Sequence, residues 1–148
     1  MIDGALASEY RAAEDSPGLL LWRVTNRWQS AQRAALRPFG LTHVQFVLLA
    51  SLVWLRADGP VTQRQLADHA ATDPMMTSQV LRVLEERDLV ERSAHPDDRR
   101  ARALAATARG RRLANDAVVA VERCDRAFFQ ALPDIAVFVR SLRALAAG

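Results

Sequence analysis

Two short groups of polar side chains in the middle of the chain have types and a spacing that suit hydrogen bonding to nucleic acid. The first group shares one face of a predicted helix and consists of Ser78, Gln79 and Arg82. Gln and Arg form paired hydrogen bonds with adenine and guanine, and a small Ser lets the helix lie deep in a groove. The second group lies where a predicted turn meets the second strand of a hairpin and consists of Asp98, Arg99 and Arg100. Arg side chains in such a turn can reach phosphates or a narrow minor groove, which has an enhanced negative potential.

The elements around these residues are predicted to be helix, turn, helix and basic hairpin. Thr62 and Gln65 stand at capping-box spacing and indicate a helix start. Asp73 and Pro74 suit the cap and first position of a second helix that runs to about residue 87. Two short strands, near residues 89–92 and 99–102, then flank a turn at 95–98. A helix presented in this way can enter a major groove while the hairpin reaches the backbone or the minor groove.

The second helix separates into two faces when its residues are placed at 100° intervals. One face is expected to anchor the helix to the core: Met76, Val80, Val83 and Leu84. The opposite face is expected to meet DNA: Met75, Ser78, Gln79, Arg82 and Glu86. Glu86 would be repelled by phosphates, so we expect it to point away or to pair with an Arg. An ordinary solvated face is the alternative interpretation; the flanking cap and basic hairpin favour DNA.

Further residues are candidates for contacts with the DNA backbone. Thr77 lies at the border between the two faces and is expected within reach of a phosphate. Thr62 and Gln63, at a helix N-terminus, offer hydrogen-bond donors to a phosphate. Asp73 and Pro74 begin the second helix and are included in the predicted interface.

From Thr62 to Gly110 the chain resembles the winged helix-turn-helix of MarR-type transcriptional regulators, and Leu41–Phe46 fits the start of the helix that precedes this motif in the family. The motifs that carry the resemblance are Leu41–Phe46, Gln65–Ala67, Met76–Arg82, Leu84–Arg92, His95–Ala101 and Thr107–Gly110. Two residues depart from the family pattern. Asp88 replaces the usual Gly before the first wing strand, and Asp tolerates a left-handed backbone better than most residues. Ala106 replaces a usual Leu, so the second wing strand is expected to pack less tightly.

The resemblance implies a mainly α fold with a two-stranded β-wing and a protein that binds double-stranded DNA. It also implies a homodimer on a pseudo-palindromic operator, with a small aromatic effector that releases a repressor. By the same analogy Arg100 enters the minor groove, Asp98 holds an arginine or the turn in place, and Arg99 contacts a phosphate. The predicted organisation is a single domain over 1–148, with the DNA-binding lobe at 41–106 and dimerisation helices at 1–40 and 107–148.

Charge is concentrated where the hairpin is predicted. All 20 basic residues are Arg, and the net charge is +3. Genomic base composition is the simplest explanation for the absence of Lys. The distribution of charge is more informative, because residues 87–112 hold eight Arg against four acidic residues. Such local clustering is typical of a DNA-binding surface.

Length and composition limit the remaining classes of protein. A chain of 148 residues, half of them hydrophobic, suits one compact domain. It has no apolar run near the length of a membrane span and no signal-peptide pattern, so we expect a cytoplasmic protein without a membrane partner. The single cysteine, Cys124, excludes an internal disulfide framework. Arg neighbours could lower its pKa, but a lone Cys on an apolar helix usually packs as a small hydrophobe.

The ends of the chain are predicted to form three helices. Ser16 and Pro17 start a helix to about residue 37, and Thr107 caps another to about residue 132. Pro133 can begin a last, very hydrophobic helix to about residue 146. Little chain remains to cover this helix, so a second copy is its expected partner. Between these ends, residues 44–57 are apolar on nearly all sides, which predicts a buried central helix.

An effector site is expected between the dimerisation helices and the DNA-binding lobe, where the family usually has it. The candidates are Trp22, Trp28, His43 and Phe46. Trp54 is a further candidate, but its helical position favours a place in the core.

Two other classes of protein were weighed against a DNA-binding regulator. An enzyme is not expected, because the three His are widely spaced and there is no paired-Cys metal motif, nucleophile elbow or Gly-rich phosphate loop. No metal or cofactor is therefore predicted. A winged-helix protein-interaction module without DNA binding is the remaining alternative.

Overall fold

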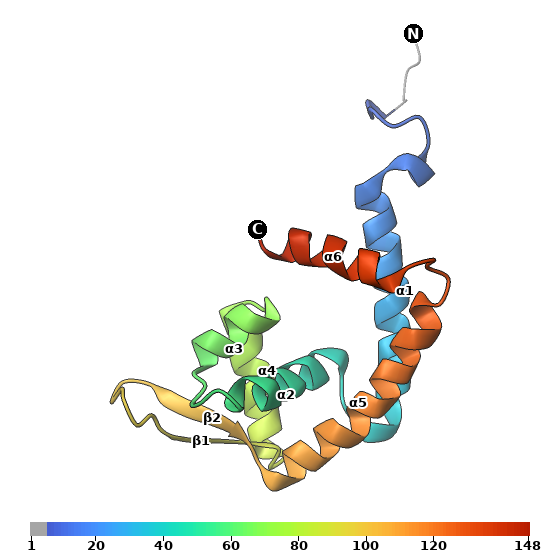
Figure 1. Cartoon of the computed structure of the whole chain (residues 1–148). Helices are drawn as coiled ribbons and strands as arrows, with labels where there is room; N and C mark the ends of the chain where they lie inside the picture. Colours follow the sequence, from blue (N-terminus) through green and yellow to red (C-terminus); the bar gives the residue numbers. More distant parts are fainter. Residues whose placement is uncertain (1–5) are drawn as a thin grey trace.

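The structure is a computed structural model that describes residues 6–148, and it is mainly helical (Figure 1). The helices and strands of this part of the chain are α1 (Pro17–Leu36), α2 (His43–Arg56), α3 (Gln63–Ala70), α4 (Pro74–Glu86), β1 (Val90–Ala94), β2 (Arg102–Ala106), α5 (Ala108–Phe129) and α6 (Ile135–Ala146). Short 3-10 turns at Ala13–Asp15 and Arg37–Phe39 precede and follow α1. The predicted order of helices, with one small β-wing, is confirmed.

Side-chain caps begin the helices at the predicted residues. Thr42 and Thr62 each form a complete capping box with the Gln three residues later. Ser16, Asp73 and Thr107 cap α1, α4 and α5 through their side-chain oxygens. These bonds satisfy backbone N–H groups that a helix leaves without an internal partner, which explains why short polar residues stand at these positions.

The boundary between the last two helices differs from the prediction. Helix α5 ends at Phe129 rather than near residue 132, and α6 begins at Ile135 rather than at Pro133. The physical reason is Asp134, whose Oδ1 accepts hydrogen bonds from the backbone N–H groups of Ala136 and Val137. This cap fixes the start of α6 two residues after the proline.

Helix α2 runs through the centre of the core, as its composition predicts. Leu48, Leu49 and Leu52 are fully buried there, against side chains from α3, α4, α5 and β2. Trp54 is an exception to the prediction, because it is 66% exposed rather than in the core. It follows Ala50 by one helical turn, on the strip of α2 that borders solvent beside α5.

The wing is an antiparallel hairpin in which Val90 pairs with Ala106 and Ala94 pairs with Arg102. Asp88 precedes it with a φ of 58°, which confirms the left-handed backbone expected at this position. After the wing, Gly110 lies so close to β1 that a Cβ would stand 2.0 Å from the carbonyl oxygen of Leu89, so only glycine fits. Ala106 is buried beside a cavity of about 210 Å³, consistent with the looser packing expected there.

Of the terminal helices, α1 and α5 pack against α2 of the winged lobe, whereas α6 adds no residue to the buried core. In Figure 1, α6 crosses α1 and ends on the same side of α1 as the lobe, above α3, while α5 runs from the wing to the start of α6. All twelve residues of α6 are at least partly exposed, including Ile135 at 50% and Leu145 at 73%. Within residues 6–148 no single helix is long and apolar enough to cross a membrane; only the bent pair Pro17–Phe39 and His43–Arg56, taken together, reaches that length and composition.

Candidate nucleic-acid interface and effector cavity

Helix α4 exposes the polar face that its sequence predicts. Met75 is 73% exposed, and Gln79, Arg82 and Glu86 are exposed along the same side, with Ser78 partly covered. Asp73 caps the helix, because its Oδ1 accepts the N–H of Met76 at 2.8 Å. Pro74 occupies the first helical position, where the missing N–H costs nothing. The outward face therefore presents an amide and a guanidinium one helical turn apart.

The buried face of α4 differs from the predicted one. Thr77, expected to reach a phosphate, is fully buried, and its Oγ1 donates to the carbonyl oxygen of Asp73 at 2.8 Å. Because this hydroxyl is satisfied inside its own helix, Thr77 packs as a small core residue and cannot contact DNA. Leu81 and Leu84 complete the buried face. Met76 and Val83, assigned to the core from their positions around the helix, are instead 43% and 39% exposed, and Val80 is half-buried.

The side chain of Arg92 links α3, α4 and β1 through hydrogen bonds. Its Nε donates to Glu85 Oε1 at 2.5 Å and its Nη2 donates to Gln63 Oε1 at 3.0 Å, so one side chain joins α3, α4 and β1. Glu85, rather than Glu86, therefore makes the pairing with an Arg that the sequence suggests. Gln63 was predicted to contact a phosphate; its oxygen is engaged here and its amide N–H groups remain available as donors. Thr62 lies next to it at the start of α3, part-exposed.

The wing tip is a turn organised by Asp98. The Oδ1 atom of Asp98 accepts the backbone N–H of Arg100 at 2.9 Å, and its carbonyl oxygen accepts the N–H of Ala101 at 3.3 Å. Asp98 thus holds the turn, one of the two roles that the resemblance implies. Arg99 and Arg100 are both exposed at this tip. Two exposed guanidinium groups therefore belong to the tip of the hairpin, and in Figure 1 the hairpin projects from the helices of the lobe.

A cavity of about 510 Å³ lies between α1 and the winged lobe. Its lining comes from α1, α2 and the α3–α4 region: Trp28, Gln29, Arg33, Thr42, His43, Val44, Val47, Ala70, Thr72 and Met76. The rings of Trp28 and His43 meet edge to face, with centroids 5.0 Å apart. A hydrogen bond to α5 fixes the orientation of the Trp28 ring, since its Nε1 donates to Asp125 Oδ1 at 2.8 Å. The same oxygen also accepts a hydrogen bond from Gln32 Nε2. The structure thus places two of the four predicted effector residues together in one cavity.

The other two candidates lie elsewhere. Phe46 is 7% exposed and belongs to the core, and Trp22 is 68% exposed on a part of α1 that does not line this cavity. The other eight lining residues were not predicted, among them Arg33, Thr72 and Met76. Arg33 follows Gln29 by one helical turn, so the helical repeat could have found it. Thr72 and Met76 reach the cavity through tertiary packing, which no local pattern reports.

Electrostatics in the cavity favour a neutral His43. Burial lowers the pKa of His43, the positive charge of Arg33 lowers it further, and Asp125 opposes both effects. Arg33 is the permanent cation of the cavity wall, and none of the described residues that line it is acidic. This combination of an aromatic wall, one guanidinium and a titratable imidazole can accommodate an organic anion with an apolar body.

Comparison with known proteins places these features in a family. The MarR family model matches residues 41–101. The HTH-type transcriptional regulator YdcH of Bacillus subtilis is 42% identical over 139 residues, which cover 93% of this chain and 95% of that protein. The chain belongs to the MarR family. It is therefore a DNA-binding transcriptional regulator, and the prediction that it is not an enzyme is confirmed.

Solved MarR-family structures are similar over nearly the whole chain. CouR from Rhodococcus jostii RHA1, determined with p-coumaroyl-CoA bound, is 34% identical with a TM-score of 0.83, and the match covers 93% of this chain and 96% of that one. The Mycobacterium tuberculosis protein Rv2887, determined in complex with salicylic acid, is 36% identical with a TM-score of 0.68, over 90% of this chain and 99% of that one. Rv2887 is also described as an HTH-type transcriptional repressor.

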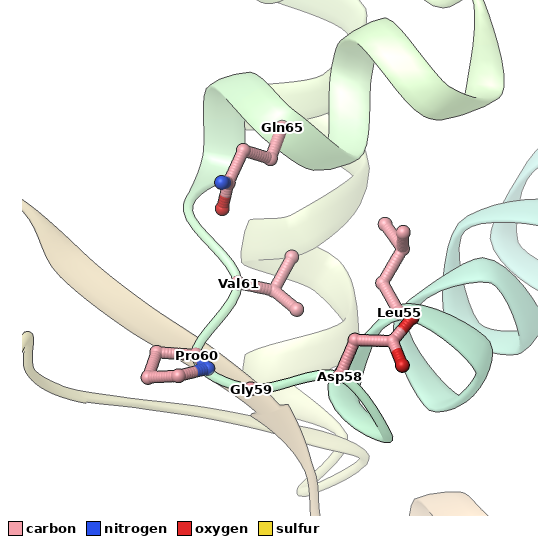
Figure 2. Close-up of a pocket in the computed structure, with 6 residues that line it drawn as sticks. All are labelled: Leu55, Asp58, Gly59, Pro60, Val61 and Gln65. Carbon is pink, nitrogen blue, oxygen red and sulfur yellow. The ribbon is translucent and has the colours of Figure 1, made fainter.

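A second cavity and Cys124 provide fewer groups that could bind a ligand or react. Figure 2 shows a cavity of about 220 Å³ between the end of α2 and the start of α3, lined by Leu55, Asp58, Gly59, Pro60, Val61 and Gln65. Gln65 is already engaged there, because its Oε1 accepts the Thr62 N–H. Burial, together with Asp125, raises the pKa of Cys124, which opposes thiolate formation and agrees with a packing role. Among residues 6–148 no cluster of three potential metal ligands was found.

Proposed function

We propose that this MarR-family protein is a ligand-responsive repressor that binds a pseudo-palindromic operator as a homodimer. The observation that carries the proposal is the exposed face of α4, with Gln79 and Arg82 one turn apart beside an arginine-tipped wing. Side chains of these two types form bidentate contacts with adenine and guanine in a major groove. The helix is capped, anchored by Leu81 and Leu84 and fixed by Arg92, so its outward face is rigidly presented.

Within this proposal the predicted interface residues have distinct roles. Gln79, Arg82 and Ser78 read base edges, with Met75 beside them at the start of the helix. Thr62, Gln63 and the first turn of α4, from Asp73 and Pro74, lie along a phosphate backbone. Arg100 enters the minor groove and Arg99 contacts a phosphate, while Asp98 keeps the turn in shape. Base contacts provide specificity, whereas phosphate contacts position the protein and make its affinity depend on salt.

Dimerisation is supported by apolar side chains that one chain leaves exposed on α1 and α6. They are Leu20, Leu21, Trp22, Val24, Ile135, Val137, Val139, Leu142 and Leu145. An exposed apolar area of this kind on a helix with no other cover is typical of an interface. In this proposal 1–40 and 107–148 form the dimerisation unit and 41–106 the DNA-binding lobe; residues 1–5 lie outside the described part. Two-fold symmetry then requires two half-sites separated by about one helical turn, roughly 10 bp.

The effector we propose is a small aromatic carboxylate bound in the cavity between α1 and the lobe. Trp28 provides an aromatic wall, and Arg33 can pair with a carboxylate through its planar guanidinium. Val44 and Val47 provide apolar surface for the ring. The relative determined with salicylic acid supports this ligand class, and the one determined with p-coumaroyl-CoA, a thioester, supports only the aromatic part of it. Salicylate is a suitable probe, and it should bind the wild type and Arg27→Ala, an exposed α1 control, more tightly than Arg33→Ala.

Binding of genomic DNA tests the proposal as a whole. Fragments selected by the protein from its source genome should contain a pseudo-palindrome, and their affinity should fall steeply as salt rises, because neutralised phosphates release counterions. Light scattering at micromolar concentration should give the mass of a dimer. A monomer that selects no sequence above random DNA would contradict the proposal and favour a winged-helix protein-interaction module.

A further inference from the structure

The turn between α3 and α4 is part of the wall of the effector cavity. Ala70 at the end of α3, Thr72 in the turn and Met76 in the first turns of α4 all line it. The recognition helix therefore contributes one of its own side chains to the cavity. A ligand in the cavity would touch the segment that fixes the start of α4, without an intervening element.

One hydroxyl pair joins this turn to the buried side of the recognition helix. Thr72 Oγ1 and Thr77 Oγ1 are 2.7 Å apart. Thr77 Oγ1 already donates its only hydrogen to the carbonyl oxygen of Asp73, so Thr72 must be the donor in the pair. Thr72 is only partly buried, whereas Thr77 is fully buried. Thr72, which a ligand in the cavity could touch, is thus hydrogen-bonded to Thr77, a core residue of α4.

The backbone of the same turn is in an unfavourable conformation. Ala71 has a φ of 53°, in the left-handed region that a Cβ disfavours. Hydrogen bonds from Ala71 N–H to Asp68 O and from Thr72 N–H to Ala67 O hold it there. A conformation of this kind persists only while its surroundings maintain it, so small displacements of Thr72 can change the turn.

We propose that Thr72 transmits occupancy of the cavity to the recognition helix. A ligand that displaces Thr72 breaks its hydrogen bond to Thr77, and the first turn of α4 shifts away from its DNA-binding position. The coupling between the cavity and α4 can be tested without a ligand, but the biological role of Thr72 rests on the proposed effector function. Thr72 is a positioning residue, because it acts on DNA through Thr77 and α4.

A double-mutant cycle tests the transmission without a ligand. Val47→Trp enlarges a cavity-lining side chain of α2 and mimics occupancy; Val53→Trp enlarges a side chain on the same helix that faces other cavities. Affinity for a selected operator is measured for Val47→Trp in the wild-type, Thr72→Val and Thr72→Ser backgrounds. Thermal unfolding of each variant shows whether it is folded. Cycles of this kind isolate the energetic coupling between two sites.

The expected result is a loss of affinity of about tenfold on Val47→Trp in the wild type, within the usual range of allosteric coupling. The loss should fall to about threefold or less in the Thr72→Val background and return in the Thr72→Ser background, which restores the hydroxyl. Val53→Trp should leave operator affinity unchanged. Equal losses in all three backgrounds, or no loss on Val47→Trp in the wild type, would overturn the inference.

A second arm with salicylate separates this inference from the proposed effector function. If salicylate weakens DNA binding equally in the wild type and in Thr72→Val, the effector proposal stands and the role of Thr72 is wrong. If salicylate neither binds nor weakens DNA binding while the Val47→Trp cycle shows coupling, the role of Thr72 stands and the proposed ligand class is wrong.

Discussion

The winged lobe and the terminal helix α6 place their apolar side chains in opposite environments. In the lobe, Leu49, Leu66 and Leu81 are fully buried, whereas Ile135 and Leu145 of α6 are 50% and 73% exposed. The lobe therefore completes its core with contacts from a single chain. Helix α6 has a comparable apolar face without such cover. A substitution in the lobe should act on the stability of each chain, and one in α6 should act on association.

The largest effect expected on association comes from Leu142→Arg, at the centre of the apolar face of α6. An unpaired charge buried in an interface should weaken the dimer by about 3–5 kcal/mol. Sedimentation velocity over a concentration series measures this change, and Arg140→Ala, on the opposite side of the helix, is the matched control. A Leu142→Arg protein that associates like the wild type would remove the contrast between the two regions.

In the lobe, Leu81→Ala should lower the free energy of unfolding by about 2–5 kcal/mol, because it opens a cavity in a closed core. Leu81 is fully buried on α4, and Met75 on the same helix is 73% exposed. Met75→Ala should therefore change stability by about 0.5 kcal/mol or less. Urea unfolding of both variants gives the comparison, and similar losses for the two would mean that the buried face of α4 has been misassigned.

Arg100→Ala should weaken DNA binding by about 1–3 kcal/mol if the guanidinium occupies a minor groove, and Arg99→Ala should weaken it less. Both substitutions should reduce the slope of log affinity against log salt, since each removes a charge near phosphates. Both residues are exposed at the wing tip, so thermal stability should be unaffected. An unchanged affinity and slope for Arg100→Ala would contradict the role of the wing.

The smallest effect is a dependence of stability on pH that involves His43. Burial and Arg33 lower the pKa of His43 in the folded protein, whereas the unfolded chain keeps the ordinary value of 6.5. Below pH 6.5 the unfolded state binds more protons, so the free energy of unfolding should fall as the pH drops from 6.5 to the lowered pKa. Urea titrations at several pH values should show a shallower fall for His43→Gln. A steeper fall for this variant would mean that the shift has the opposite sign.

Local spacing was enough to predict the framework of the fold. The capping boxes at Thr42 and Thr62 depend on residues only three positions apart, and both are present. The left-handed backbone of Asp88 was expected from the family resemblance, because Asp88 replaces a usual Gly, and it is present. These features depend on short stretches of chain, which a single sequence records directly.

Burial of individual side chains was harder to predict because it depends on distant partners. Thr77 was placed at the border between the two faces of its helix, within reach of a phosphate, but its hydroxyl is satisfied by the carbonyl oxygen of Asp73 and it is buried. Trp54 was placed in the core by its helical position, yet α5 leaves its strip of α2 open. The cavity combines side chains from α1, α2 and the α3–α4 region, so only Trp28 and His43 were anticipated.

The central claim is that α4 reads base sequence through Gln79 and Arg82, and it is tested most directly by comparing binding-site logos. Logos of the wild type, Gln79→Ala and Arg82→Ala are determined by selection from random DNA under the same salt conditions. We expect a pseudo-palindrome for the wild type and, for each variant, a relaxed base preference at symmetric positions of both half-sites, with non-specific binding retained. Logos that are identical for all three proteins would contradict it.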